Sequence, residues 1–162
     1  MNSSSLGPQS ASARRSAEAE LRGLVAKFAS AQQRLVGTAR RWLRQRLPTA
    51  HEVVYEYRDC FVISYSPNEH GYEGVFAIRG SAEGVRLYFN QAKGLPDPGK
   101  LLQGSGNLAR WIPLEAASTL ALPAVVRLFD AALARNRVPF AAAGRGPIAV
   151  RATSAKAKRS AR

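Results

Sequence analysis

The sequence predicts an α+β fold in which a two-layer domain has a five-stranded antiparallel sheet with helices packed on one face. Three observations support this prediction. Apolar residues recur at helical spacing as far as residue 46, the period changes to two from Glu52 onward, and a helical pattern returns at Pro123. The expected strands are separated by short connections, which favour antiparallel hairpins over βαβ crossovers. Helices and strands that are segregated along the chain are typical of an α+β domain.

Two helices are expected before the sheet, over residues 17–28 and 31–46. Ser16 is a suitable N-cap for the first helix, and the acidic residues that follow it favour the positive end of a helix. Pro48 ends the second helix because proline lacks the backbone N–H that a helix interior requires. The apolar face of the second helix comprises Leu35, Val36, Ala39, Trp42 and Leu43.

The expected strands are short and rich in β-branched and aromatic residues. They cover residues 52–57, 61–66, 74–79, 85–90 and 108–112. A last helix is expected over residues 123–135, because Pro123 suits an early helical position and apolar residues follow it at helical spacing.

The chain of 162 residues is expected to form one domain. Residues 1–15 are rich in Ser, Ala, Gln and Pro, and residues 139–162 form a basic tail rich in Ala, Lys and Arg. Both segments lack the apolar periodicity that offsets ordering entropy, so both are predicted to be disordered. The folded domain is then expected over residues 16–138.

The connection between the last two expected strands contains a proline-stiffened turn, a glycine-rich bend and a short strand. These are Leu95-Pro96-Asp97-Pro98, Leu101-Leu102-Gln103-Gly104-Ser105-Gly106 and Arg110-Trp111-Ile112-Pro113-Leu114. This run resembles the YdhG-like domain family, and the resemblance extends over roughly residues 18–136. It implies the same α+β architecture.

YdhG-like domains are distantly similar in architecture to frataxin, which implies iron handling for some relatives. This chain departs from that pattern, because its early helices are basic and Arg58-Asp59-Cys60 stands where many relatives carry a Gly-x-Pro turn. A small-ligand or metal (iron)-handling domain that uses the loop of residues 90–110 is therefore kept as the alternative function.

Within that loop, Gly104, Ser105 and Gly106 can form a backbone nest for an anion, with Arg110 as a fixed positive charge and Trp111 beside it. The run lacks the Lys-Ser/Thr ending of a P-loop and leads into no helix. The other interpretation is a tight turn in which glycine supplies a positive φ.

The excess of positive charge lies at the two ends of the chain. Residues 1–46 hold nine Lys or Arg against two Glu, residues 137–162 hold seven and no acid, and the part between them holds eight against nine acids. Basic flanks attract polyanions by neutralising phosphates, so weak, non-specific nucleic-acid binding is expected. The other interpretation is a solubilising tail. The candidate nucleic-acid-binding residues are Arg34, Arg40, Arg41 and Arg44 on the second helix, with Arg151, Lys156, Lys158 and Arg159 near the end.

Strand aromatics could also stack bases if they lie on an uncovered face of the sheet. The sequence leaves open which of them point outward, because a register slip of one residue moves every side chain to the opposite face.

No catalytic constellation is found, so the protein is expected to be a non-enzymatic binding or accessory module with no cofactor and no metal site. Cys60 with His51 or His70 could form a thiolate–imidazole pair, but a free cysteine more often behaves as a small buried hydrophobe. A single cysteine, the lack of an apolar run as long as a membrane span and the lack of a signal peptide together favour a cytoplasmic location.

Overall fold

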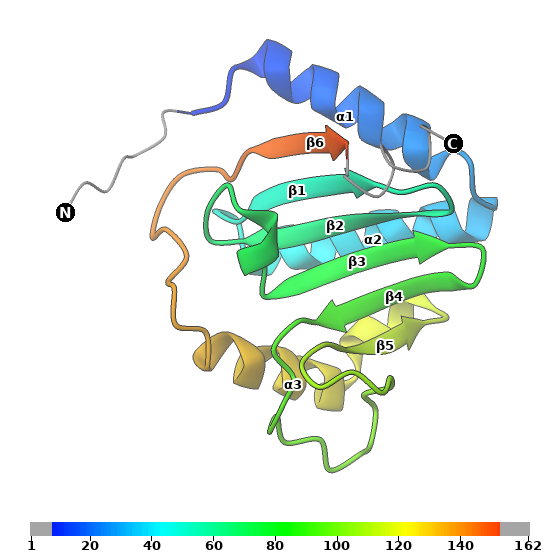
Figure 1. Ribbon diagram of the computed structural model, residues 1–162, viewed down its shortest axis with the longest axis vertical. Helices are drawn as coiled ribbons and strands as arrows, with labels where there is room; N and C mark the ends of the chain where they lie inside the picture. Colours follow the sequence, from blue (N-terminus) through cyan, green and yellow to red (C-terminus); the bar gives the residue numbers. More distant parts are fainter. Residues whose placement is uncertain (1–7, 153–162) are drawn as a thin grey trace.

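A six-stranded sheet forms the centre of the computed structural model, which describes residues 8–152 (Figure 1). The strands are β1 (His51–Glu56), β2 (Cys60–Ser66), β3 (Phe76–Ser81), β4 (Gly84–Phe89), β5 (Arg110–Leu114) and β6 (Ile148–Ala152). Their order is β5-β4-β3-β2-β1-β6, with β1 to β5 antiparallel and β6 parallel to β1. The α+β class is confirmed. The expected five-stranded, purely antiparallel sheet is wrong, because a sixth strand joins it in parallel.

Helices α1 (Ala11–Val25), α2 (Ser30–Arg46) and α3 (Pro123–Ala134) pack on one face of the sheet. In Figure 1, α2 and α3 lie behind the sheet, and α1 runs alongside β6 at its edge. Two short 3-10 helices, η1 (Gly71–Glu73) and η2 (Ala117–Ala121), lie in the connections. None of the helices within residues 8–152 is long and apolar enough to cross a membrane.

Aromatic rings join the helices to the sheet. Phe76 of β3 stacks on Phe129 of α3 with ring centroids 4.4 Å apart, and Trp42 of α2 meets Phe129 edge-on at 4.9 Å. Phe76 and Phe129 are both at most 2% exposed. Such ring pairs add to the stabilisation that burial of their area already supplies. The core therefore forms where the apolar faces of the helices pack against the sheet, as expected.

The first helix begins earlier than the sequence predicts. Ser10 is its N-cap, and the Ser10 hydroxyl accepts a hydrogen bond from the backbone N–H of Ala13 at 3.1 Å. Residues 11–15 are therefore helical, although residues 1–15 were predicted to be disordered. A serine at the cap satisfies one of the N–H groups that the first turn leaves unpaired, and this local signal outweighs the polar composition. Residues 1–7 lie outside the described residues.

The C-terminal segment also differs from the prediction, because β6 lies within the tail that was expected to be disordered. Ile148 is 1% exposed in the core, and the N–H of Glu52 donates to the carbonyl of Pro147 at 2.9 Å where β6 joins β1. Gly146 allows this approach, since a Cβ there would lie 1.8 Å from the carbonyl oxygen of Ala50. The pairing of β6 with β1 joins segments that are almost a hundred residues apart in the sequence. Apolar periodicity, which is assessed within a short window, does not reveal such a pairing. Residues 153–162 lie outside the described residues.

Candidate nucleic-acid interface

The strand aromatics are divided between the two faces of the sheet. Phe61, Tyr65, Phe76 and Phe89 point toward the helices and are at most 1% exposed. Tyr55, Tyr57, Tyr88 and Trp111 occupy the alternate positions, so they project from the opposite face and are partly exposed. We call this second face, which none of α1, α2 and α3 covers, the open face.

Trp111, Tyr88 and Arg86 form a contact group on the open face. Tyr88 of β4 is directly opposite Trp111 of β5, and their ring centroids are 6.4 Å apart at an interplanar angle of 38°. The guanidinium carbon of Arg86 lies 3.8 Å from the centroid of the Trp111 ring. A cation over an indole ring is attracted by the ring quadrupole, which fixes both side chains at the surface. The group thus presents two aromatic rings and a positive charge together.

A second arginine lies directly beside this group. Arg79 of β3 is the cross-strand partner of Arg86 of β4. Like charges in such opposite positions repel each other. Glu83 partly compensates Arg86 through an ion pair at 2.7 Å, whereas Arg79 forms no ion pair within residues 8–152 and only a 3.4 Å contact with the Ser81 hydroxyl. The open face therefore carries a positive charge that an anion would stabilise.

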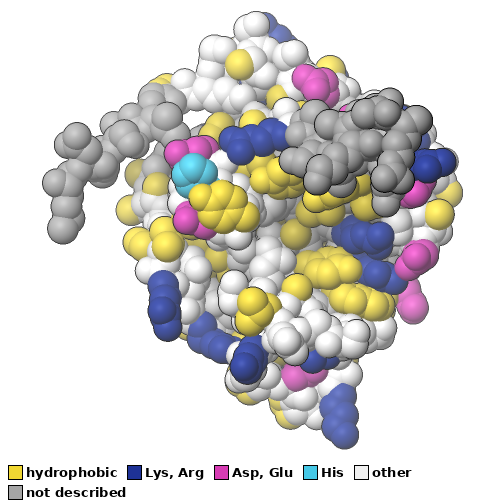
Figure 2. Space-filling view, in the orientation of Figure 1, with side chains coloured by type: hydrophobic (Ala, Val, Ile, Leu, Met, Phe, Trp, Pro, Cys, Tyr) yellow, Lys and Arg dark blue, Asp and Glu magenta, His cyan; other side chains and the backbone are white. Residues whose placement is uncertain are grey.

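The same two strands border a shallow hollow in the open face with a volume of about 380 Å³. Its walls are formed by Tyr57, Cys60, Val62, Ala77, Arg79, Tyr88 and Asn90. Burial, followed by the proximity of Cys60 and Tyr55, raises the pKa of the Tyr57 phenol, so Tyr57 stays a neutral donor in this hollow. Figure 2, which looks onto this face, shows hydrophobic side chains interleaved with Lys and Arg side chains over the right-hand part of the sheet.

At the other end of the open face, η1 folds over β1 and β2. The Ser64 hydroxyl donates to the carbonyl of Gly71 at 2.7 Å, and a Cβ at Gly71 would lie 2.1 Å from the Tyr55 hydroxyl. Tyr55 is therefore partly covered by η1, whereas Tyr72 of η1 is 79% exposed and stacks on His70 with ring centroids 5.3 Å apart. An exposed aromatic ring thus borders the open face on this side as well.

The four arginines predicted on the second helix occupy two different environments. Arg34 and Arg41 are exposed. The side chain of Arg40 is only 16% exposed and that of Arg44 is 30% exposed, and both face Glu18 of α1 and Glu52 of β1. The four therefore do not form one exposed stripe, because the polar side of α2 packs partly against α1 and the sheet edge.

Arg40 is the centre of a buried ionic network. It donates to both oxygens of Glu18 at 2.6 and 2.5 Å, and to both oxygens of Glu52 at 2.8 and 3.0 Å. Tyr65 completes the network by donating from its hydroxyl to Glu52 at 2.9 Å. Hydrogen bonding from Arg40 lowers the pKa of the Glu18 carboxyl, and burial together with the Glu52 charge raises the pKa of Tyr65 well above its usual range. The network holds α1, α2 and β1 together.

In the predicted anion nest, the Arg110 side chain binds the loop itself. Gly104 has a φ of +106°, which confirms the expected left-handed turn, whereas Gly106 lies outside the left-handed region. The guanidinium of Arg110 donates to the carbonyl of Gly104, so this side chain folds back onto the loop. Asp97 caps the same loop by accepting from the N–H groups of Leu101 and Leu102 at 2.9 Å each. Trp111 belongs instead to the open face, and Ser105 is exposed.

The remaining predicted residues do not come together as a metal or catalytic centre. Within the part of the chain that the structure describes, no group of three or more His, Cys, Asp or Glu side chains could hold a metal ion. His51 lines a small cavity of about 140 Å³ with Glu69 and Arg151, and burial lowers the pKa of its imidazole. Arg151 is exposed on β6, opposite Tyr55, whereas Lys156, Lys158 and Arg159 lie outside the described residues.

Arg79 and Arg86 were not predicted as site residues, whereas Tyr57 and Tyr88 were among the strand aromatics whose direction the sequence left open. A usable signal was present in the predicted strand 85–90, where Arg86 and Tyr88 alternate with Val85, Leu87 and Phe89. Alternation of this kind indicates that the polar and aromatic residues share the face away from the core. Comparisons of the chain with family models, with curated proteins and with solved structures found no match.

Proposed function

We propose that this protein is a non-enzymatic accessory protein that binds single-stranded nucleic acid, without sequence preference, on the open face of its sheet. The observation that carries the proposal is the group formed by Trp111, Tyr88, Arg86 and Arg79 on β3, β4 and β5. Proteins that bind single strands combine aromatic platforms for base stacking with a positive surface that follows the phosphates.

Each part of the group has a function in such binding. The ring of Tyr88 offers a π-face to unpaired bases, and Trp111 offers the face that Arg86 does not cover. Base stacking of this kind tolerates every sequence. Arg79 lies beside these rings without a carboxylate partner among the described residues, and a phosphate would compensate its charge. Duplex DNA presents its bases only by their edges, so a flat face of rings favours the single strand.

The basic flanks contribute long-range attraction in this proposal. Residues 1–46 and 137–162 carry the whole positive excess of the chain, whose net charge is +13. Charges of this kind raise the local concentration of a polyanion and make its binding strongly dependent on salt. The open face then supplies the preference for unpaired bases, which charge alone does not give.

The resemblance of the segment Leu95–Leu114 to YdhG-like domains is part of the same proposal. The α+β class and the packing of helices on one face of the sheet are compatible with it. The loop of residues 90–110 is then a structural element that presents Trp111, because the backbone of Gln103 bonds to that of Trp111 in both directions at 2.8 and 3.1 Å.

The test is a titration of the full-length protein with a 12-nucleotide oligo-dT, the same length of oligo-U and a duplex DNA at ~50 mM salt. Tyr88→Leu is expected to weaken single-strand binding by about 5- to 150-fold, since one stacking interaction supplies ~1–3 kcal/mol. Arg79→Gln is expected to weaken it by about tenfold or more, because it removes a charge-assisted hydrogen bond to a phosphate. Leucine at residue 88 keeps the apolar bulk of the strand while removing the aromatic ring.

Arg41→Gln is the matched control, because it removes the same charge from an exposed position of α2 on the helical side of the sheet. It is expected to weaken binding less than twofold. Equal losses for Arg79→Gln and Arg41→Gln would show that net charge alone drives binding. No binding of any nucleic acid by the full-length protein at this salt concentration would overturn the proposal.

A further inference from the structure

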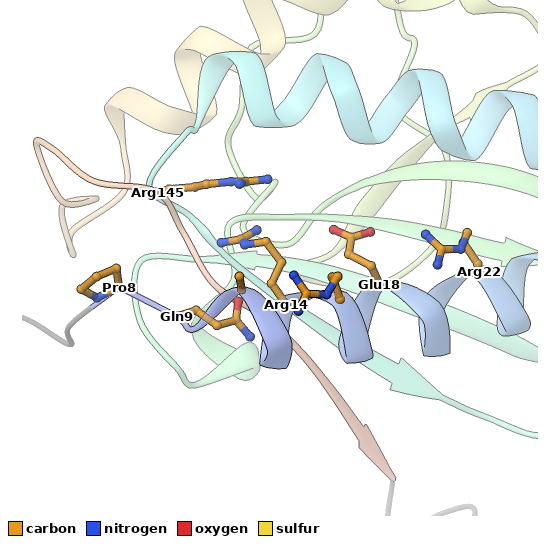
Figure 3. A pocket seen from close by; sticks show the side chains of 8 residues that line it. Pro8, Gln9, Arg14, Glu18, Arg22 and Arg145 are labelled. Carbon is orange, nitrogen blue, oxygen red and sulfur yellow. The ribbon is translucent and has the colours of Figure 1, made fainter.

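Another cavity lies away from the open face, between α1 and the segment that leads into β6 (Figure 3). Its volume is about 640 Å³, which is larger than the hollow on the open face. Four of its lining residues are arginines, namely Arg14, Arg15, Arg22 and Arg145, and the one acidic lining residue is Glu18. We call this cavity the arginine pocket.

The charge of Glu18 compensates the arginines of the pocket only in part, because it acts on Arg14 without forming an ion pair with it. Both carboxylate oxygens of Glu18 accept hydrogen bonds from Arg40, which lies on the inner side toward the sheet. Within residues 8–152, none of Arg14, Arg15, Arg22 and Arg145 forms an ion pair with a carboxylate. The pocket therefore holds four positive side chains, and no carboxylate among the described residues lies within ion-pair distance of any of them.

Of the pocket arginines, Arg14 lies in the environment least favourable to its charge. Its Nη2 donates to the carbonyl of Gly146 at 2.7 Å, while its Nη1 is buried without a hydrogen-bond partner among the described residues. A buried donor without a partner costs free energy, and more so when it belongs to a charged group. Burial, and then the nearby charges of Arg145 and Arg44, lower the pKa of Arg14.

The geometry also brings two of these arginines together from distant parts of the chain. Figure 3 shows Arg145 reaching over α1 from the segment before β6, with the Arg14 side chain pointing toward it. Gln9 fixes this arrangement, because its side chain exchanges two hydrogen bonds with the backbone of Ile148 at 2.8 and 3.0 Å. The walls of the pocket are thus held in place by the docking of β6.

We propose that the arginine pocket binds a compact polyphosphate anion, a di- or triphosphate group. Guanidinium groups bind phosphate oxygens with paired, charge-assisted hydrogen bonds, and several of them around one cavity suit an anion that carries several charges. A single bound group can compensate the charges of Arg14 and Arg145 at the same time, since the two lie close enough to affect each other. This site is separate from the open face and does not depend on the function proposed there.

The test is a calorimetric titration of the full-length protein with inorganic pyrophosphate and inorganic triphosphate at ~100 mM salt, with orthophosphate and sulfate as comparison anions. Saturable binding with one site is expected for pyrophosphate and triphosphate, tighter than for orthophosphate. Arg145→Gln and Arg22→Gln, both at exposed positions, are expected to weaken it about tenfold or more. Arg14→Gln is expected to weaken it further, because Arg14 lines the pocket beside Arg145.

Arg127→Gln is the control, because Arg127 is an exposed residue of α3 outside the pocket and the change in net charge is the same. It is expected to leave pyrophosphate binding unchanged, as is the open-face variant Tyr88→Leu. The proposal is overturned if pyrophosphate shows no saturable binding up to ~1 mM, or if Arg127→Gln weakens it as much as Arg145→Gln. It is also overturned if oligonucleotides bind through these arginines while pyrophosphate fails to compete. If Arg14→Gln does not fold, the exposed variants at Arg22 and Arg145 decide the question.

Discussion

Arg40 lies on the polar side of its helix and is nevertheless one of the residues that hold the fold together. Its guanidinium bridges Glu18 of α1 and Glu52 of β1, and Glu52 is 2% exposed. Burial of a guanidinium lowers its pKa, but here the two carboxylates outweigh burial and raise the pKa of Arg40. An arginine that faces away from the apolar side of a helix can therefore be internal when a second helix covers it.

Replacing Arg40 with methionine is expected to destabilise the protein by about 2–4 kcal/mol, because the buried Glu52 carboxylate loses the guanidinium that donates to both its oxygens and keeps only Tyr65 and the more distant Arg44. The control is Arg41→Gln, which removes an exposed arginine from the next position of α2 and is expected to change stability by less than about 0.5 kcal/mol. Urea denaturation followed by circular dichroism measures both. Similar midpoints for the two variants would show that the network adds no net stability.

At the scale of the elements, β6 is the strand whose position depends most on contacts distant in sequence. It pairs with β1 in parallel register, from Glu52 opposite Ile148 to Glu56 opposite Ala152. The chain reaches this position through Gly146, whose N–H donates to the carbonyl of Pro48 at 2.9 Å. β6 can therefore pair with β1 only because the backbone at Gly146 approaches the backbone of residues 48–50 closely.

Gly146→Ala is expected to destabilise the protein by about 1–3 kcal/mol, because the new methyl group would overlap the backbone of Ala50 and push β6 away from β1. Gly23→Ala is the matched control. Nothing lies within 4 Å of a Cβ at Gly23 in α1, so alanine there is expected to stabilise the helix by up to about 1 kcal/mol. Thermal unfolding measures both changes, and equal melting temperatures for the two variants would contradict this account of the β6 junction.

At the scale of the whole molecule, the tertiary structure redistributes the charge that the sequence shows. The segment of residues 47–136 has one more acid than base, yet Arg79 and Arg86 are opposite each other on one face of the sheet. The N-terminal and C-terminal flanks, far apart in sequence, meet where Arg14 binds the carbonyl of Gly146. A neutral segment can thus present a positive face, and two basic flanks can form one positive region.

Under the proposed function, the flanks and the open face are expected to affect the salt dependence of binding differently. Replacing the four basic residues after position 153 (Lys156, Lys158, Arg159 and Arg162) with glutamine removes phosphate contacts from the flank. The slope of log K against log salt for oligo-dT is expected to fall by up to about 3, since each contact with a single strand contributes ~0.7.

Tyr88→Leu is expected to lower affinity at every salt concentration and leave that slope unchanged, because it removes a ring and no charge. Fluorescence anisotropy between ~50 and 200 mM salt distinguishes the two variants. A slope that is the same for the flank variant and the unmodified protein would mean that these four residues make no phosphate contacts.

The sequence predicted those elements that local patterns specify. The boundaries of α2, α3 and β1 to β5 agree with the expected ranges to within about two residues, because each element shows its own apolar periodicity and most connections are short. The start of α1 was missed by six residues, since its first turn is exposed and only Ser10 marks it. The candidate site was predicted in part. Trp111 was predicted beside the anion nest, and both Trp111 and Tyr88 were among the aromatics that could stack bases on an uncovered face. Arg79 and Arg86 were not predicted, because the outward face of the sheet was left open.

By itself, then, the sequence determined the α+β class, the helices, five of the strands of the described sheet and the positive charge at the two ends of the chain. Only the tertiary structure decided that Ile148 belongs to the core, that Arg40 is internal and that Tyr88 and Trp111 share the open face. Periodicity acts within about ten residues, whereas strand register, the pairing of buried charges and the docking of β6 depend on which distant segments meet. Those contacts are made only once the whole chain has folded.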